Sequence, residues 1–430
     1  MRHTYIHVPF CRRRCSYCDF SIAVRKHLQP ESFVGAIKSE HELLSNRGDW
    51  DDEPLETLYL GGGTPSLLPA EHVATLVGYF LGQEHVGPGS LKTPGNDPAR
   101  SRMGNRKSKI ANRPSEIPFP FPLSPFPEVT LEANPDDVTQ DNTRAWVDSG
   151  INRISLGVQS FDSTALAWMH RTHTADQSLA AYANLRDSGV TSVSLDLIFG
   201  LPPELSHLFR DDLDRALELE PDHLSVYGLT VEPRTPFARW ISRGAASPTP
   251  EGRYAEEFMA AHETLTAAGY EHYEISNYAK PGHRAVHNSA YWTGCPYAGL
   301  GPSAHRFNGH TRSWNVSPWA EYQKLVSTRN DPTEGRETLT QEQRRLERIY
   351  LALRTSDGLG DEELSHLNQE MVNRALERGW MERFENRKSQ IANRQSEIPS
   401  ASSDRFRLTP EGWLRLDELT PGLTTSAQGG

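Results

Sequence analysis

Residues 5–18 read YIHVPFCRRRCSYC and join a short apolar run to three closely spaced cysteines, Cys11, Cys15 and Cys18. Three thiolates on one tight loop can hold a single inorganic centre. All-thiolate zinc sites usually use four ligands in two separate CxxC pairs, but the fourth cysteine of this chain, Cys295, is far away in the sequence. The spacing therefore favours a 4Fe–4S cluster with one open iron.

Two other interpretations of the cysteine loop stay open at this point. One is a structural zinc ion that also uses Cys295 or His7, and the other is a loop with buried thiols and no metal. Arg12, Arg13 and Arg14 stand between the first two cysteines. Because neighbouring positive charge favours the thiolate and offsets the negative charge of a cluster, we expect these arginines to lower the thiol pKa values.

The overall composition excludes several classes of protein. The 430-residue chain has 45 basic and 56 acidic side chains and a formal net charge of −11, so it has no general attraction for nucleic acid or anionic lipid. No apolar run is long enough for a membrane-spanning helix, and no signal-peptide segment precedes the cysteines. We expect a cytoplasmic protein with reduced thiols that is not an integral membrane protein and binds no nucleic acid.

Around the cysteine loop, β-rich and helical stretches alternate as far as residue 235. Strands are predicted at residues 5–8, 57–60, 129–132, 153–158, 193–198 and 223–227, with helices at 71–81, 141–149, 164–169, 178–187 and 209–219. This alternation indicates an α/β fold with a parallel sheet, curled into a full or partial (β/α) barrel. In such folds functional residues follow the carboxyl ends of the strands.

Two segments resemble low-complexity inserts, at residues 83–127 and 385–403. They contain nearly identical copies of one sequence, NRKSKIANRPSEIP at 105–118 and NRKSQIANRQSEIP at 386–399. Such inserts are tolerated at exposed loop tips. We expect neither insert to be needed for the core function.

The remaining segments complete the domain organisation. The core barrel is expected over residues 1–235, and residues 236–337 are expected to complete it. Helical patterns followed by two short strands over residues 338–420 predict a winged-helix-like α+β module. Its many acidic residues favour packing on the barrel over DNA binding. Residues 421–430 are expected to be a disordered tail.

A glycine-rich turn at residues 61–66 (GGGTPS) follows the second predicted strand. Glycine lets backbone N–H groups approach a charged ligand closely. This turn and the cysteine loop together resemble the signature of the radical S-adenosylmethionine (SAM) superfamily. The resemblance implies that the three cysteines bind a 4Fe–4S cluster whose open iron holds SAM. An electron from the cluster then cleaves SAM to methionine and a 5′-deoxyadenosyl radical, so the protein's task is to position this cofactor.

Three further segments narrow the resemblance: EANP at 132–135, SLGVQSF at 155–161 and DLIFGLP at 196–202. They are similar to the family of the oxygen-independent coproporphyrinogen III dehydrogenase (oxidase) and the HemW-like heme chaperones. The resemblance covers nearly the whole chain apart from the inserts and the tail. It implies SAM contacts at Tyr5, Tyr17, Gly62, Gly63, Thr64, Glu132, Gln159, Arg171, Asp196, Thr230 and His305, the last two through backbone atoms. Each polar residue among them could instead be a hydrogen-bonded strand-end residue.

Several features distinguish the members of that family. The dehydrogenase pattern is CxxxCxxCxC, but Phe20 stands here where its further cysteine would be, and only ten residues precede Cys11, where the dehydrogenase has an extension. Residues 287–292 (HNSAYW) match the HNxxYW pattern of the chaperones. Histidine can ligate heme iron, and the Tyr291 and Trp292 rings offer flat apolar surface to a porphyrin. We therefore expect His287 to contact heme.

The resemblance thus implies a heme chaperone that binds a 4Fe–4S cluster, SAM and heme. It would transfer heme to acceptor proteins, for example respiratory proteins at the membrane, without coproporphyrinogen dehydrogenase activity. No catalytic residue is assigned. The alternative is the enzyme that makes protoporphyrinogen IX from coproporphyrinogen III in porphyrin biosynthesis. A radical enzyme with an unrelated substrate is a third hypothesis.

Overall fold

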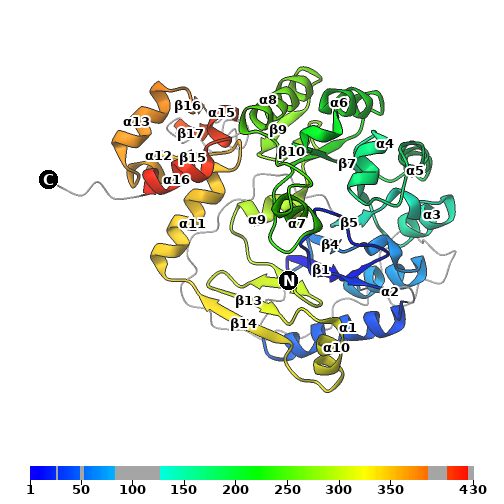
Figure 1. Cartoon of the computed structure of the whole chain (residues 1–430). Coiled ribbons are helices and arrows are strands. Elements are labelled where there is room, and N and C mark those ends of the chain that lie inside the picture. The colour runs from blue at the N-terminus through cyan, green and yellow to red at the C-terminus, as the bar shows by residue number, and fades with distance from the viewer. Residues whose placement is uncertain (26–27, 49–52, 83–125, 386–403, 425–430) are drawn as a thin grey trace.

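The computed structural model describes residues 1–25, 28–48, 53–82, 126–385 and 404–424 (Figure 1). Its centre is a nine-stranded sheet in the order β11-β1-β4-β5-β6-β7-β8-β10-β9. Neighbouring strands from β11 to β8 run parallel, and β10 and β9 are antiparallel additions. The bounds are β1 His3–Val8, β4 Thr57–Gly62, β5 Glu128–Ala133, β6 Arg153–Gln159, β7 Ser192–Phe199, β8 His223–Gly228, β9 Glu271–Glu274, β10 Asn277–Ala279 and β11 Ala298–Leu300.

All six predicted strands are confirmed, and they are consecutive neighbours in the sheet. Leu58, Leu131 and Leu195 on three of them are completely buried. Strands of a parallel sheet are covered on both faces, which explains why they read as nearly continuous apolar runs. The two outermost strands, β11 and β9, do not pair with each other. The sheet is therefore an open, partial barrel.

Helices cover the outside of this sheet (Figure 1). They are α1 Pro30–Asn46, α2 Ala70–Phe80, α3 Gln140–Asp148, α4 Ser163–Trp168, α5 Ala175–Asp187, α6 Phe209–Glu218 and α8 Glu251–Ala267. Local sequence fixes several of their starts: the side chains of Thr139, Asp162 and Thr174 each accept a hydrogen bond from the first turn of a helix. The five helices predicted over residues 71–219 are confirmed.

Residues 236–338 add strands at both ends of the large sheet and form a small sheet beside it. This segment contains α7 Pro236–Ser242, α9 Val286–Trp292, β12 His305–Phe307, β13 Thr311–Asn315, α10 Trp319–Ser327 and β14 Thr333–Thr338. Strand β11 pairs with β1, and β12, β13 and β14 form an antiparallel sheet. The first strand of the chain is therefore an inner strand of the large sheet, with β11 on one side and β4 on the other.

The C-terminal part forms a separate three-stranded sheet with helices, as a winged-helix-like module requires. It contains α11 Gln341–Leu353, β15 Leu359–Gly360, α12 Asp361–Ser365, α13 Gln369–Glu377, β16 Met381–Glu385, β17 Asp404–Leu408, α15 Pro410–Trp413 and α16 Leu416–Thr424. The sheet order is β15-β17-β16. Helix α16 runs past the predicted start of the tail because Leu419 and Leu423 are buried. Both sequence repeats lie outside the described residues.

A search of the described helices finds none that is both long enough and apolar enough to cross a membrane.

A buried carboxylate connects α1 to the end of the barrel. Glu40 has no solvent exposure and accepts hydrogen bonds from the Gly301 amide (2.8 Å), the Asn315 side-chain amide (2.6 Å) and the Tyr322 hydroxyl (2.5 Å). Burial raises the pKa of Glu40. The three donors come from residues far away in the chain, so Glu40 holds α1 against the segment that follows β11.

Replacing Glu40 by Ala should therefore lower the free energy of unfolding by about 3 kcal/mol, because several buried donors lose their acceptor. Urea denaturation monitored by circular dichroism measures the change. Glu42→Ala is the matched control, since Glu42 is exposed on the same helix. Equal unfolding midpoints for the two variants would contradict the role given to Glu40.

Candidate functional site

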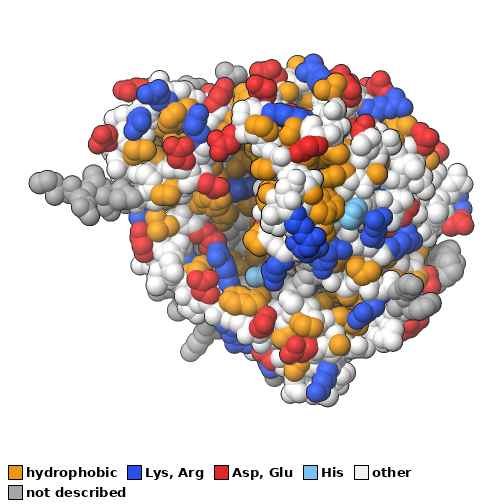
Figure 2. All heavy atoms as spheres, in the orientation of Figure 1, with side chains coloured by type: hydrophobic (Ala, Val, Ile, Leu, Met, Phe, Trp, Pro, Cys, Tyr) orange, Lys and Arg blue, Asp and Glu red, His pale blue; other side chains and the backbone are white. Residues whose placement is uncertain are grey.

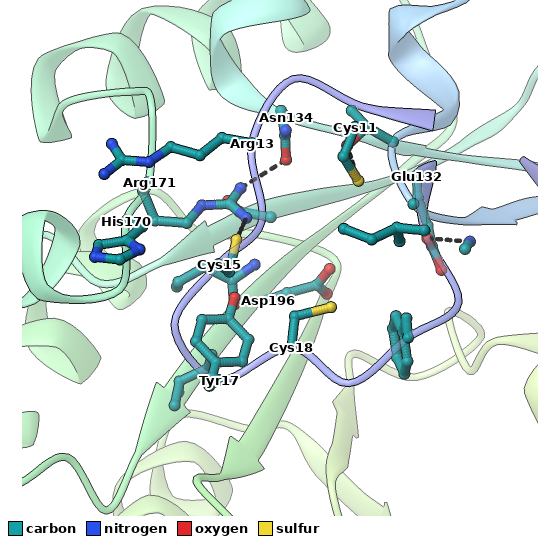
Figure 3. A pocket seen from close by; sticks show the side chains of 18 of the residues that line it. Cys11, Arg13, Cys15, Tyr17, Cys18, Glu132, Asn134, His170, Arg171 and Asp196 are labelled. Atoms are coloured by element: carbon teal, nitrogen blue, oxygen red, sulfur yellow. Dashed lines mark hydrogen bonds between the residues drawn. The ribbon is translucent and has the colours of Figure 1, made fainter. Parts of the chain in front are cut away.

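A pocket of about 500 Å³, here called the cysteine pocket, lies at the carboxyl ends of the parallel strands. The cysteine loop and residues at or just after the ends of β4, β5, β6, β7 and β8 line it (Figure 3). In Figure 2 one face of the molecule is hollowed near its centre, with basic and hydrophobic side chains beside the hollow. The predicted site residues in the pocket lining are Cys11, Cys15, Cys18, Tyr17, Gly62, Gly63, Thr64, Glu132, Gln159, Arg171, Asp196 and Thr230.

Short backbone pairings hold the cysteine loop in place. β2 (Phe10–Cys11) and β3 (Ala23–Val24) are parallel neighbours and close the base of the loop. At its middle, the Ser16 amide donates to the Met169 carbonyl (3.1 Å), and the Ser16 carbonyl accepts from the Phe237 amide (2.9 Å). These contacts connect the loop to the segments that follow β6 and β8. Its shape is therefore set by the protein itself.

Two of the thiols accept hydrogen bonds inside the pocket. Cys11 is 8% exposed, and its Sγ accepts from the Thr64 hydroxyl (3.4 Å). The Sγ of Cys15 accepts from the Arg171 guanidinium (3.6 Å). Donors directed at sulfur favour a thiolate, which is the form that binds iron.

The predicted effect of the arginines is confirmed in direction for Arg14, but it does not decide the net pKa shift of Cys11 or Cys18. Burial, the largest effect on both groups, raises the pKa of the Cys11 thiol and raises that of Cys18 to about 11. Arg14 lowers both pKa values, but by less than burial raises them. Arg12 forms ion pairs with two carboxylates, those of Asp136 (2.7 Å) and Asp137 (2.6 Å).

The three thiols line one pocket without converging on a single point. Among the described residues, no three His, Cys, Asp or Glu side chains are placed to bind one metal ion. A mononuclear zinc site requires such convergence, whereas cysteines around a four-iron cluster each bind a different iron. Cys295 does not line the cysteine pocket, and its Sγ accepts from the Thr293 hydroxyl (3.2 Å).

The glycine turn after β4 packs too closely for any other residue. A Cβ atom on Gly62 would lie 2.6 Å from the His7 ring, and one on Gly63 would lie 2.8 Å from the Phe10 carbonyl oxygen. Gly62 also has φ of 110°, a conformation that favours glycine. The Gly63 amide donates to the Val8 carbonyl (2.7 Å), so the turn is fastened to the end of β1.

Two carboxylates, one on β5 and one on β7, line the pocket. Glu132 accepts from the Tyr59 hydroxyl (2.8 Å) and from the Gly62 amide (3.0 Å). Asp196 accepts from the Ser155 hydroxyl (2.9 Å). Burial raises the pKa of Glu132 to about 7 and that of Asp196 to about 6. Both groups can accept hydrogen bonds from hydroxyl or ammonium groups of a ligand.

Arg171 supplies a half-buried positive charge. Its guanidinium donates to Asn134 Oδ1 (2.6 Å) and to the Gly157 carbonyl (3.0 Å), but its buried Nε has no hydrogen-bond partner among the described residues (Figure 3). A buried donor without a partner costs free energy unless a ligand completes it. The pocket therefore suits an anionic group such as a carboxylate.

The structure gives roles to three residues that were not named as site residues. Asn134 orients Arg171, while Tyr59 and Ser155 hold the two pocket carboxylates. Asn134 and Ser155 belong to the EANP and SLGVQSF segments, whereas Tyr59 lies inside a strand and carries no such signal. His170 and Gln159 also line the pocket, and both have positive φ angles, of 61° and 68° respectively. Such backbone conformations of non-glycine residues are often found at functional sites.

A second pocket of about 440 Å³, here called the aromatic pocket, adjoins the first. Phe20, Gly62 and Glu132 line both pockets. Two predicted SAM contacts, Tyr5 and His305, lie in the lining of the aromatic pocket and not of the cysteine pocket. The other aromatic side chains of this pocket are His7, Tyr291, Tyr297 and Trp314.

His287 lines neither of these pockets. It is 1% exposed, its Nδ1 is hydrogen-bonded to the Thr57 hydroxyl (2.7 Å), and its Nε2 is hydrogen-bonded to the Tyr291 hydroxyl (2.9 Å). Burial lowers its pKa to about 3, so the ring is neutral. In this conformation both ring nitrogens are occupied, and His287 acts as a core residue beneath Tyr291. Heme contact by His287 stays a prediction that would need this packing to open.

The fold and the cysteine pocket define a radical SAM protein, and residues 5–216 match the Radical SAM superfamily. The chain is 33% identical to the heme chaperone HemW of a Synechocystis species over 97% of this chain and 95% of the relative. It is 31% identical to the heme chaperone HemW of Bacillus subtilis, over 84% and 85% respectively. This chain belongs to the HemW family.

A solved structure, the coproporphyrinogen III oxidase HemN of Escherichia coli, has the same fold. The TM-score is 0.71 over 98% of this chain and 90% of that chain, at 19% sequence identity.

The pKa of Glu132 generates a prediction about stability. Its folded-state value of about 7 lies above the ordinary 4.5, so between these values the folded protein binds more protons than the unfolded chain. The contribution of the Glu132 carboxyl group to the free energy of unfolding is complete below pH 4.5. Up to about 3 kcal/mol of it is lost as the pH rises through 7. Urea unfolding at pH 5 and pH 8 should show a smaller difference for Glu132→Gln than for the wild type. If the two proteins showed the same change in unfolding free energy between pH 5 and pH 8, Glu132 would not be the group responsible.

The cysteine loop gives a second prediction. Replacing Cys11, Cys15 or Cys18 by Ser should abolish the iron–sulfur absorption of the anaerobically reconstituted protein, because each thiolate would hold a different iron of the expected cluster. Cys295→Ser is the matched control and should keep the full absorption and iron content. If Cys295→Ser also lost the cluster, the three-cysteine site would be incorrect.

Proposed function

We propose that this protein is a heme chaperone that binds a 4Fe–4S cluster, SAM and heme and passes heme to acceptor proteins. The observation that carries the proposal is the meeting of three thiols, a tight glycine turn and an unpartnered arginine donor in one pocket at the strand ends. Membership of the HemW family supports the heme-handling part, since the curated relatives are named heme chaperones.

The residues of the cysteine pocket suit these cofactors. Cys11, Cys15 and Cys18 would hold the cluster. The glycine turn exposes backbone to a small charged ligand, and the Arg171 guanidinium, whose Nε has no hydrogen-bond partner among the described residues, can pair with the carboxylate of SAM. When bound, the cluster and SAM supply reductive radical chemistry. The protein's own part is to orient SAM between Arg171 and the carboxylate of Glu132.

Phe20 favours a chaperone over a porphyrin-converting enzyme. It occupies the position two residues beyond Cys18, where the dehydrogenase pattern has a cysteine. Its ring is 59% exposed and lies at the junction of the two pockets. An exposed aromatic ring offers surface to a flat apolar ligand, but it cannot serve as the acid, base or thiol that a cysteine could provide.

The experiment that tests the proposal compares binding with turnover. The full chain is reconstituted anaerobically with iron and sulfide, and hemin retention through gel filtration is measured. Coproporphyrinogen III conversion is assayed separately with SAM and a reductant. We expect retained heme, its transfer to an apo-globin, and no decarboxylated porphyrin.

The Escherichia coli HemN enzyme serves as the positive control for the turnover assay. Conversion of coproporphyrinogen III by this chain without stable heme binding would overturn the chaperone proposal. Failure of heme to leave the protein for an apo-globin would contradict the transfer step while leaving heme binding intact.

A further inference from the structure

Helix α7 packs directly against the cysteine loop. The amide of Phe237, in the first turn of α7, donates to the carbonyl of Ser16 (2.9 Å), which lies between the second and third cysteines of the loop. Phe237 is 1% exposed, whereas Arg239 and Arg243 farther along the chain are exposed. The helix therefore contacts the loop on one side and solvent on the other.

Aromatic side chains connect the outer part of α7 to the same loop. The centroid of the half-buried Trp240 ring lies 5.6 Å from that of Trp168, and the Trp168 centroid lies 5.0 Å from that of Phe237. Trp168 and Tyr17 of the loop pack on one cluster of buried apolar residues. These separations lie in the range of interacting aromatic pairs, about 4.5–7 Å. Packed rings thus lead from the surface of α7 to the cysteine loop.

The surface over α7 and the cysteine loop is basic, although the whole protein is acidic. Residues 12–25 and 230–244 contain seven arginines and two acidic residues, whereas the chain has a net charge of −11. Figure 2 shows Lys and Arg side chains gathered where Figure 1 places α7, and in Figure 3 the Arg13 side chain points away from the thiols. Four of the seven arginines form the exposed surface considered below: Arg13, Arg234, Arg239 and Arg243.

The charge of this surface is not cancelled by neighbouring carboxylates. Within the part of the chain that the structure describes, none of the four arginines forms an ion pair with an acidic side chain. Arg239 donates to the Arg234 carbonyl (3.1 Å). Glu232, the acidic residue nearest to α7 in the sequence, accepts from the Thr230 hydroxyl (3.0 Å). An acidic protein, repelled by the rest of this chain, is therefore steered to α7.

The proposed function requires a supply of electrons. Each electron that the cysteine pocket uses in reductive chemistry has to be replaced from another molecule. Electron transfer between proteins weakens steeply with distance, so a donor protein has to dock close to the cysteine loop. Redox proteins associate through small interfaces in which charge guides the encounter. The basic surface over α7 has both the charge and the position that such a donor needs.

We propose that the surface formed by Arg13, Arg234, Arg239 and Arg243 is the docking site of an acidic protein that donates one electron. The Trp240 and Trp168 rings lie on the path of the electron to the cysteine loop. The inference rests on the proposed function, because it needs a cluster that receives the electron. The donor is oxidised by one electron and the cluster is reduced by one, from the 2+ to the 1+ state, and no bond forms or breaks.

The first test measures docking alone. The probe is oxidised flavodoxin, an acidic protein that carries a flavin, and isothermal titration calorimetry measures its binding to the reconstituted full chain. The double variant Arg239→Glu/Arg243→Glu should weaken this binding by about tenfold or more, because like charges then face each other. Added salt should also weaken binding to the wild type, since salt screens exposed charges.

The second test measures electron entry. Stopped-flow absorption follows reduction of the cluster by saturating flavodoxin hydroquinone and, separately, by photoreduced 5-deazaflavin, a small reductant that needs no docking surface. Trp240→Leu should keep the affinity for flavodoxin but slow reduction by flavodoxin several-fold, and Trp240→Phe should restore the rate. Reduction by deazaflavin should be the same in all three proteins, which separates the electron path from damage to the cluster.

The matched control is Arg374→Glu/Arg378→Glu. These two arginines are exposed, stand four residues apart at the end of α13 in the C-terminal module, and change the net charge by the same amount when replaced. The control should bind flavodoxin and accept its electron like the wild type. Equal losses in the two double variants would mean that only total charge matters, and the assignment to α7 would be wrong.

The outcomes separate this inference from the proposed function. If the reconstituted wild type shows no iron–sulfur absorption, the proposed function itself fails. If the cluster forms but the wild type does not bind flavodoxin, or if Arg239→Glu/Arg243→Glu binds it with wild-type affinity, only the docking surface is refuted. A wild-type rate of reduction by flavodoxin in Trp240→Leu would remove Trp240 from the electron path.

Discussion

The close packing of the Gly61–Gly63 turn against β1 is the contact on which the rest of the site depends. Side-chain atoms of this turn would collide with the His7 ring, with Glu132 and with the backbone at Phe10. Because the turn has none, β4 can end directly beside the base of the cysteine loop and still direct an amide toward Glu132. One short segment thus sets the positions of the thiols, a carboxylate and the wall shared with the aromatic pocket.

The sequence was sufficient for features that local interactions decide. The six inner strands are apolar runs between turn residues, and the cysteine loop and glycine turn are recognisable from residue type and spacing alone. It was not sufficient for contacts between distant segments. The three residues of β11 give no local sign that they extend the sheet beside β1, and nothing near Glu40 predicts that its carboxylate collects donors from residues 301–322.

His287 and the arginines illustrate two further limits. A motif records which side chains are present and not which way they face: Glu128 accepts from the amides of Val286 and His287 at the start of α9, and the resulting helix turns His287 into the core. The arginines beside the cysteines suggested lowered thiol pKa values, but burial depends on the folded environment and is the larger effect. Charge can be counted along a sequence, whereas desolvation cannot.

The wall shared by the two pockets has a thermodynamic consequence. Both pockets are lined by Phe20, Gly62 and Glu132, so a ligand in one pocket that moves any of them, or changes the protonation of Glu132, changes the surroundings of a ligand in the other pocket. Such coupling is reciprocal. If a ligand in the cysteine pocket changes the affinity of the aromatic pocket for its own ligand by some factor, the ligand in the aromatic pocket changes the affinity of the cysteine pocket by the same factor. Because burial raises the pKa of Glu132 to about 7, the pH also affects this coupling between the two ligands.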